Sequence, residues 1–123
     1  IGGTSPSSAG TPTLKSLAEG FAGKPLPLVG GNVAPGSLGI MGFSLGNLGG
    51  SGVNFGNGIV GNLALPLVGD LVIAPTDANG DMLLNITSAP NFPGTTLYTQ
   101  FVGLDGTGGD DYASSQALGI TLN

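Results

Sequence analysis

Two strand patterns near the end of the chain, joined by an acidic glycine-rich loop, restrict what this sequence can fold into. Residues Ser115–Leu122 alternate strictly, with Leu118, Ile120 and Leu122 on one face and small or polar residues on the other. This period of two is typical of a strand with one buried face. Thr95–Leu104 instead carries apolar side chains on both faces. Such a strand is either central in a sandwich or covered by something outside the domain.

Similar patterns recur upstream. Strands are expected at Thr13–Ala18, Lys24–Val29, Ser37–Leu45, Asn62–Val68, Asp70–Ala74 and Asp81–Thr87. Pro25 and Pro27 lack the N–H that a strand ladder needs, so Lys24–Val29 is expected at a sheet edge or in a polyproline conformation. Asn79-Gly80 indicates a hairpin turn. Strands at this spacing, without helical periodicity, predict an all-β fold: one antiparallel β-sandwich, Ig-like or jelly-roll-like, of about seven or eight strands.

Two segments fall outside this pattern. Gly46–Asn62 holds seven glycines and four asparagines in seventeen residues. It is either a long loop or a set of irregular strands packed close to another backbone. Residues 1–12 are rich in Ser, Gly and Pro, which predicts an extended N-terminal arm before a domain at 13–123. An arm of this kind frays unless something holds it, and we expect a neighbouring subunit to do so.

Charge is the most unusual bulk property. Only nine of 123 side chains are charged, or 7%, and the formal net charge is −5, whereas soluble domains carry about 25% charged residues. Without a basic cluster, nucleic acid and anionic membranes are poor partners. No apolar run is long enough to span a membrane. A surface with so few charges favours contact with copies of the same chain or with a solid matrix.

Part of the chain resembles a known kind of domain. The residues that carry the resemblance form a Gly-x-x-Leu-Tyr-x-Gln strand and a closing Ser-x-x-Leu strand: Gly94, Leu97, Tyr98, Gln100, Asp105, Ser114 or Ser115, and Leu118 through Leu122. The pattern is similar to that of a C-terminal-type β-sandwich domain of exported bacterial proteins. The resemblance covers residues 70–122 and implies a β-sandwich and an extracytoplasmic address. It implies no catalytic activity.

Two short motifs have the spelling of active-site sequences. Gly42–Gly46 spells a nucleophile elbow with Ser44 in the reactive place, but the chain has no His to act as its base. Gly56–Gly61 spells a dinucleotide fingerprint, but the strand-like sequence after it contains Pro66 in place of a helix. We expect neither motif to be functional, and we predict that the protein is not an enzyme.

Calcium is the one cofactor that the sequence suggests. Asp105, Asp110 and Asp111 share one loop, and Asp77, Asn79 and Asp81 share another. Closely spaced oxygen ligands are what Ca²⁺ prefers. Asp and Asn are also common turn formers, so an ordinary turn is the alternative in both loops. Apart from calcium, the sequence suggests no cofactor.

These observations predict a structural protein that assembles with itself. Strand addition is the expected mechanism, with the arm or a sheet edge pairing with a neighbour. The predicted assembly residues are Ile1, Gly2, Gly3, Thr4, Ser5 and Pro6. The alternative is a non-catalytic module that attaches a larger secreted protein to polysaccharide or to the cell envelope. Because the chain begins without Met, we expect an extracellular or cell-surface location after removal of a signal peptide; a chain trimmed from a longer protein is the other explanation.

Overall fold

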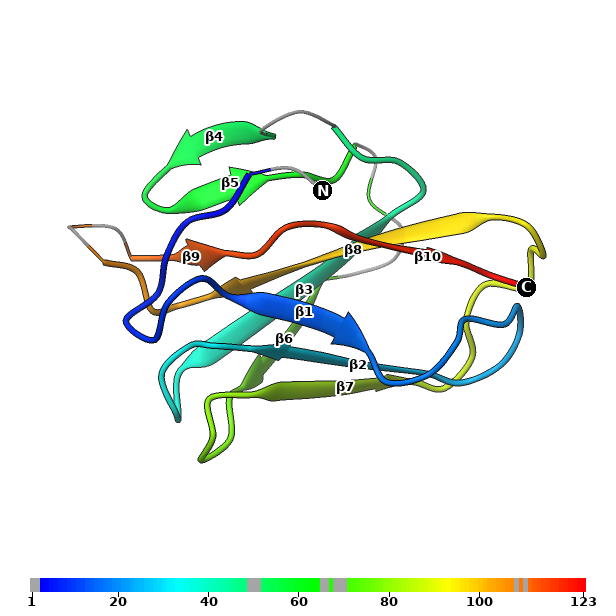
Figure 1. Ribbon diagram of the computed structural model, residues 1–123, viewed down its shortest axis with the longest axis horizontal. Helices are drawn as coiled ribbons and strands as arrows, with labels where there is room; N and C mark the ends of the chain where they lie inside the picture. Colours follow the sequence, from blue (N-terminus) through cyan, green and yellow to red (C-terminus); the bar gives the residue numbers. More distant parts are fainter. Residues whose placement is uncertain (1–2, 49–51, 65–66, 68–70, 108, 110) are drawn as a thin grey trace.

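The fold is built from short antiparallel strands (Figure 1). The structure, a computed structural model, describes residues 3–48, 52–64, 67, 71–107, 109 and 111–123. Its strands are β1 (Thr13–Ser16), β2 (Leu26–Gly31), β3 (Leu38–Ser44), β4 (Val53–Gly56), β5 (Ile59–Gly61), β6 (Val72–Pro75), β7 (Met82–Ile86), β8 (Thr96–Gly103), β9 (Ala113–Ser114) and β10 (Leu118–Thr121). No helix occurs in these residues. The all-β prediction is confirmed, with ten strands in the described ranges rather than seven or eight.

Two sheets pack face to face around one core. The three-stranded sheet has the order β1-β2-β7, and the five-stranded sheet has the order β10-β8-β3-β6, with β9 also paired to β8. Leu26 and Leu28 of β2 face Leu97 and Phe101 of β8 within a single buried cluster. Gly30 permits this close packing, since a Cβ there would lie 2.5 Å from the Phe101 ring. The sandwich is therefore closed by apolar contacts between β2 and β8.

The two strand patterns near the end of the chain are neighbours in one sheet. β10 pairs with β8 in antiparallel register, with Ile120 opposite Leu97. β8 is central in its sheet, because β3 pairs along its other side. Its inner face carries Leu97 and Phe101, and its outer face carries Tyr98 and Val102. Of the two alternatives for the strand with two apolar faces, the central position is observed.

A small hairpin covers part of the outer face of the five-stranded sheet. β4 and β5 pair only with each other, and Figure 1 shows them (green) on the side of β8 away from β2 and β7. Asn57 and Gly58 form the turn, with φ of 57° and 83°, which are the positive values that a tight hairpin turn requires. Of the two alternatives for the glycine-rich segment, short strands packed on another part of the chain are observed.

The turn before β7 corrects one prediction. Asn79-Gly80 was expected to close a hairpin between its flanking strands, but β6 pairs with β3 and β7 pairs with β2. The segment therefore crosses from one sheet to the other. Asp77 shapes it, because its Oδ1 accepts hydrogen bonds from the N–H groups of Asn79 (2.8 Å) and Asp81 (3.0 Å). An Asx turn of this kind reverses the chain without requiring the flanking strands to pair.

Two further strand predictions are wrong. The proline-containing strand β2 is central, not at an edge. Pro27 is tolerated because its carbonyl accepts from Leu17 N–H, just beyond the end of β1. The missing N–H faces the same side, at the end of the pairing with β1, so its loss interrupts no further pair of residues. The predicted strand at 62–68 is also not formed over its described residues, where Leu63 makes only an isolated bridge with Asn47; Leu65, Pro66 and Val68 lie outside them.

Candidate functional site

The N-terminal arm lies against its own chain. Ser5 and Ser114 exchange two backbone hydrogen bonds, of 3.0 and 3.1 Å. Gly3 N–H donates to Asn62 Oδ1 at 2.9 Å, and Asn62 Nδ2 donates back to the Gly3 carbonyl at 2.8 Å. At these residues the arm is held by partners in the same chain; contact with a neighbouring subunit stays a prediction.

The six predicted assembly residues therefore differ in their surroundings. Ser5 is buried, whereas Thr4 and Pro6 are exposed and Gly3 is half-buried. Ile1 and Gly2 lie outside the described residues. Their role in assembly stays a prediction.

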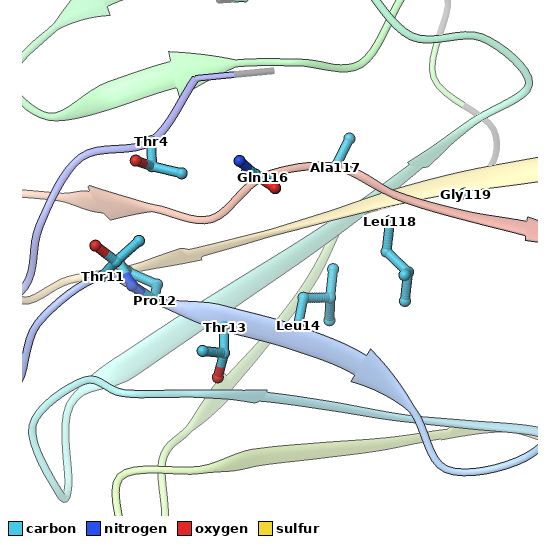
Figure 2. Close-up of a pocket in the computed structure, with 9 residues that line it drawn as sticks. All are labelled: Thr4, Thr11, Pro12, Thr13, Leu14, Gln116, Ala117, Leu118 and Gly119. Atoms are coloured by element: carbon cyan, nitrogen blue, oxygen red, sulfur yellow. The ribbon is translucent and has the colours of Figure 1, made fainter. Parts of the chain in front are cut away.

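Beside the arm, the sandwich is open along one side. β1 ends the three-stranded sheet and β10 ends the five-stranded sheet, and an opening of about 600 Å³ lies between them. Figure 2 shows Leu14 on β1 and Leu118 on β10 pointing into it from the two sides. We call this opening the seam.

The lining of the seam contains no charged side chain. Its residues come from the arm, from β1 and from the approach to β10: Thr4, Thr11, Pro12, Thr13, Leu14, Gln116, Ala117, Leu118 and Gly119. Leu14 and Leu118 also pack against the core cluster. The seam is thus a neutral opening that leads from two sheet edges to the edge of the core.

A buried polar network fastens the β4–β5 hairpin to the sheet. Gln100 on β8 accepts from Asn62 N–H through Oε1 at 2.9 Å and donates through Nε2 to the carbonyls of Ser115 (2.9 Å) and Val60. Ser114 Oγ accepts from Val60 N–H at 3.0 Å. Side chains thus replace strand pairing in attaching the hairpin. The strand prediction missed this role of Gln100, and its only signal was a single amide side chain in a strand of apolar residues and threonines.

The predicted calcium loop is described only in part. Asp105 Oδ2 accepts from Ala34 N–H (2.8 Å) and from Ser8 Oγ (2.6 Å), so it links the arm to the segment between β2 and β3. Asp111 Oδ2 accepts from Asn57 Nδ2 at 3.1 Å. Asp110 lies outside the described residues. Among those that are described, no three acidic side chains gather into a metal-binding group, and calcium binding stays a prediction.

Ser44, at the reactive place of the nucleophile-elbow spelling, has a structural contact. It is 2% exposed, and its Oγ donates to the Ala64 carbonyl at 2.6 Å. This bond ties the end of β3 to the segment that follows the hairpin. A hydroxyl that is buried and already donating is poorly placed to attack a substrate.

Comparison of the chain with protein-family models, with curated proteins and with solved structures finds no match. In the described part of the chain, no helix is long and apolar enough to cross a membrane.

Proposed function

We propose that this protein is a non-catalytic structural subunit that acts outside the cell or at its surface and assembles with copies of itself by strand addition. The observation that carries the proposal is the seam. There, β1 and β10 each end a sheet, and no charged side chain lines the opening between them. The N–H and C=O groups along an edge strand are a template for pairing with another chain. An added strand gains backbone hydrogen bonds at such an edge.

The opposite side of the sandwich supplies a matching pair of edges. β7 ends the three-stranded sheet there, and β6 ends the five-stranded sheet. Both strands expose a large apolar residue: Leu83 on β7 is 66% exposed, and Ile73 on β6 is 62% exposed. A copy placed side by side would bring its β7 to β1 and its β6 to β10, so that both sheets continue. Because two different surfaces meet in this contact, repetition that does not close into a ring produces a filament.

Of the two routes for strand addition, the contacts of the arm favour the sheet edge. The backbone of Ser5 is already bonded to the backbone of Ser114, and that of Gly3 to the side chain of Asn62. Releasing the arm for a neighbour would break these bonds before any were gained. Edge pairing at the seam breaks none of them.

A pair of lysines on the two edges of the seam tests the proposal. Thr13 on β1 and Thr121 on β10 are exposed. Lysine on an edge strand discourages pairing, and the double variant adds a second lysine to β1, which already carries Lys15, and a first one to β10. Sedimentation velocity and electron microscopy of the unaltered protein should show filaments that grow with concentration. The Thr13→Lys/Thr121→Lys variant should sediment as an 11.9 kDa monomer.

Ala78→Lys/Asn79→Lys is the matched control, since it adds the same two charges at an exposed turn. It should assemble at least as readily as the unaltered protein. The proposal would be overturned if the unaltered protein stayed monomeric at high concentration. It would also be overturned if the Thr13→Lys/Thr121→Lys variant assembled to the same extent as the unaltered protein. Single particles retained on polysaccharide would favour the attachment module instead.

A further inference from the structure

A second opening, separate from the seam, lies between the outer face of the five-stranded sheet and the β4–β5 hairpin. Its volume is about 570 Å³, which falls within the roughly 300–1,000 Å³ of ligand pockets. Ile40 and Val102 contribute from the sheet, Phe55 from the hairpin, and Leu63 and Leu71 from flanking segments. We call it the apolar groove. Most of its lining is apolar, which is the usual composition of a ligand site.

Of the two polar side chains that line the apolar groove, Gln100 and Tyr112, the first already has its hydrogen-bond partners. Gln100 is 6% exposed, its Oε1 accepts from Asn62 N–H, and its Nε2 donates to two carbonyls. It therefore has little left to offer a ligand. A peptide lying in the groove would bring an N–H and a C=O with every residue, and each would be buried without a partner. A hydrocarbon chain brings no such groups.

The charges around the apolar groove restrict the head group of such a ligand. Tyr112 lines the groove, and the preceding residue, Asp111, is an exposed carboxylate bonded to Asn57 at the hairpin turn. The only basic residues of the chain, Lys15 and Lys24, lie in and next to the other sheet. An anionic head group would meet a negative charge with no counter-charge in the groove lining. An uncharged head group avoids this cost.

We infer that the apolar groove binds the hydrocarbon chain of an uncharged long-chain lipid. The hydrocarbon chain lies along Ile40, Val102 and Leu71, and Phe55 of the hairpin covers it. The head group remains in solvent beside Tyr112. Affinity comes from the apolar area of the hydrocarbon chain and of the groove that binding removes from water. This inference concerns a different face from the seam and does not depend on self-assembly.

Fluorescence displacement tests the inference on the full chain. N-phenyl-1-naphthylamine, an uncharged fluorophore, is bound first, and 1-monopalmitoylglycerol is then added below its micelle concentration. We expect displacement by 1-monopalmitoylglycerol and none by glycerol. Ionised palmitate should bind at least about tenfold more weakly, because its carboxylate lacks a counter-charge. Failure of 1-monopalmitoylglycerol to displace the probe, or equal binding of palmitate, would overturn the inference.

Matched variants locate the site. Phe55→Ser and Leu71→Ser alter groove residues that are 66% and 52% exposed. Each should weaken 1-monopalmitoylglycerol binding about tenfold, the scale on which one apolar side chain contributes to affinity. Phe92→Ser and Leu17→Ser change residues that are 66% and 55% exposed and lie outside the groove, so affinity should stay unchanged.

Equal loss in all four variants would contradict the assignment, and thermal melting of each variant separates this result from unfolding. Groove variants that change sedimentation of the protein but not lipid binding would show a contact between copies instead, which also overturns the inference.

Discussion

Two buried threonines differ in whether their hydroxyls are satisfied. Thr99 on β8 is fully buried, and its Oγ1 has no hydrogen-bond partner in the described part of the structure. Thr76 is also buried, but its Oγ1 donates to the Ala34 carbonyl at 2.8 Å and accepts from Ser37 N–H at 2.9 Å. A buried polar group without a partner costs stability, whereas a bonded one contributes to it. The same substitution at the two positions should therefore have opposite effects.

Thr99→Val is expected to raise the free energy of unfolding by roughly 1 kcal/mol, because it removes an unpaired hydroxyl while keeping the shape of the side chain. Thr76→Val is expected to lower it by about 1–3 kcal/mol, because it leaves Ser37 N–H without its partner and removes one of the two hydroxyls that donate to the Ala34 carbonyl. Urea unfolding of both variants measures the difference. Destabilisation of equal size at the two positions would mean that Thr99 has a partner in solution.

At the level of strands, alternation predicted which residues face the core but not which strands pair. Met82, Leu84 and Ile86 were expected to point inward, and all three belong to or pack against the core. The same pattern suits any antiparallel neighbour. For this reason the sequence predicts a hairpin at the turn at 76–80, although this turn connects the two sheets. The sequence also gives no sign that Pro27 can lie in a central strand, because this depends on where the neighbouring strand β1 ends.

The candidate sites were harder to predict than the strands. Neither the seam nor the apolar groove is lined by residues that are contiguous in sequence. The seam is lined by the arm, by β1 and by the residues that lead into β10. The apolar groove is lined by the two hairpin strands and by strands of the five-stranded sheet. Gln100, which anchors the hairpin, leaves no periodic signal. Glycine-rich strands such as β4 and β5 lack the alternation that reveals a strand. Only the tertiary arrangement brings these segments together.

The position of the arm is testable because the chain has no cysteine. Directly hydrogen-bonded residues on antiparallel strands have Cα atoms about 5.5 Å apart, a separation that a disulfide spans. In a Ser5→Cys/Ser114→Cys variant, oxidation should therefore give an intramolecular bond. Nonreducing electrophoresis should show a monomer band of altered mobility. A ladder of linked oligomers from this variant, but not from Ser5→Cys alone, would show instead that copies exchange their arms.

For the molecule as a whole, few charges and open edges act in the same direction. Twelve large apolar side chains are exposed in the described residues, while the whole chain has only nine charged ones. Ordinary edge strands are protected by charges that repel a second copy. Here the net charge of −5 is the main long-range force that keeps copies apart, since repulsion between like-charged molecules maintains dispersion.

Assembly should therefore depend on pH through the net charge. The chain carries −5 at pH 7, and the charge falls to zero near pH 4.1, the isoelectric point of the sequence. As pH falls through this range, repulsion between copies decreases, so the concentration needed for assembly should fall as well. Added salt at pH 7 should shift assembly in the same direction, because it screens the same repulsion. Light scattering over a series of pH values and salt concentrations measures both effects.

The Thr13→Lys/Thr121→Lys variant has a net charge less negative by two. Repulsion alone therefore predicts that it assembles more readily than the parent, whereas blocked edges predict that it assembles less readily. Stronger assembly of that variant at pH 7 would show that net charge, not strand pairing at the seam, controls association.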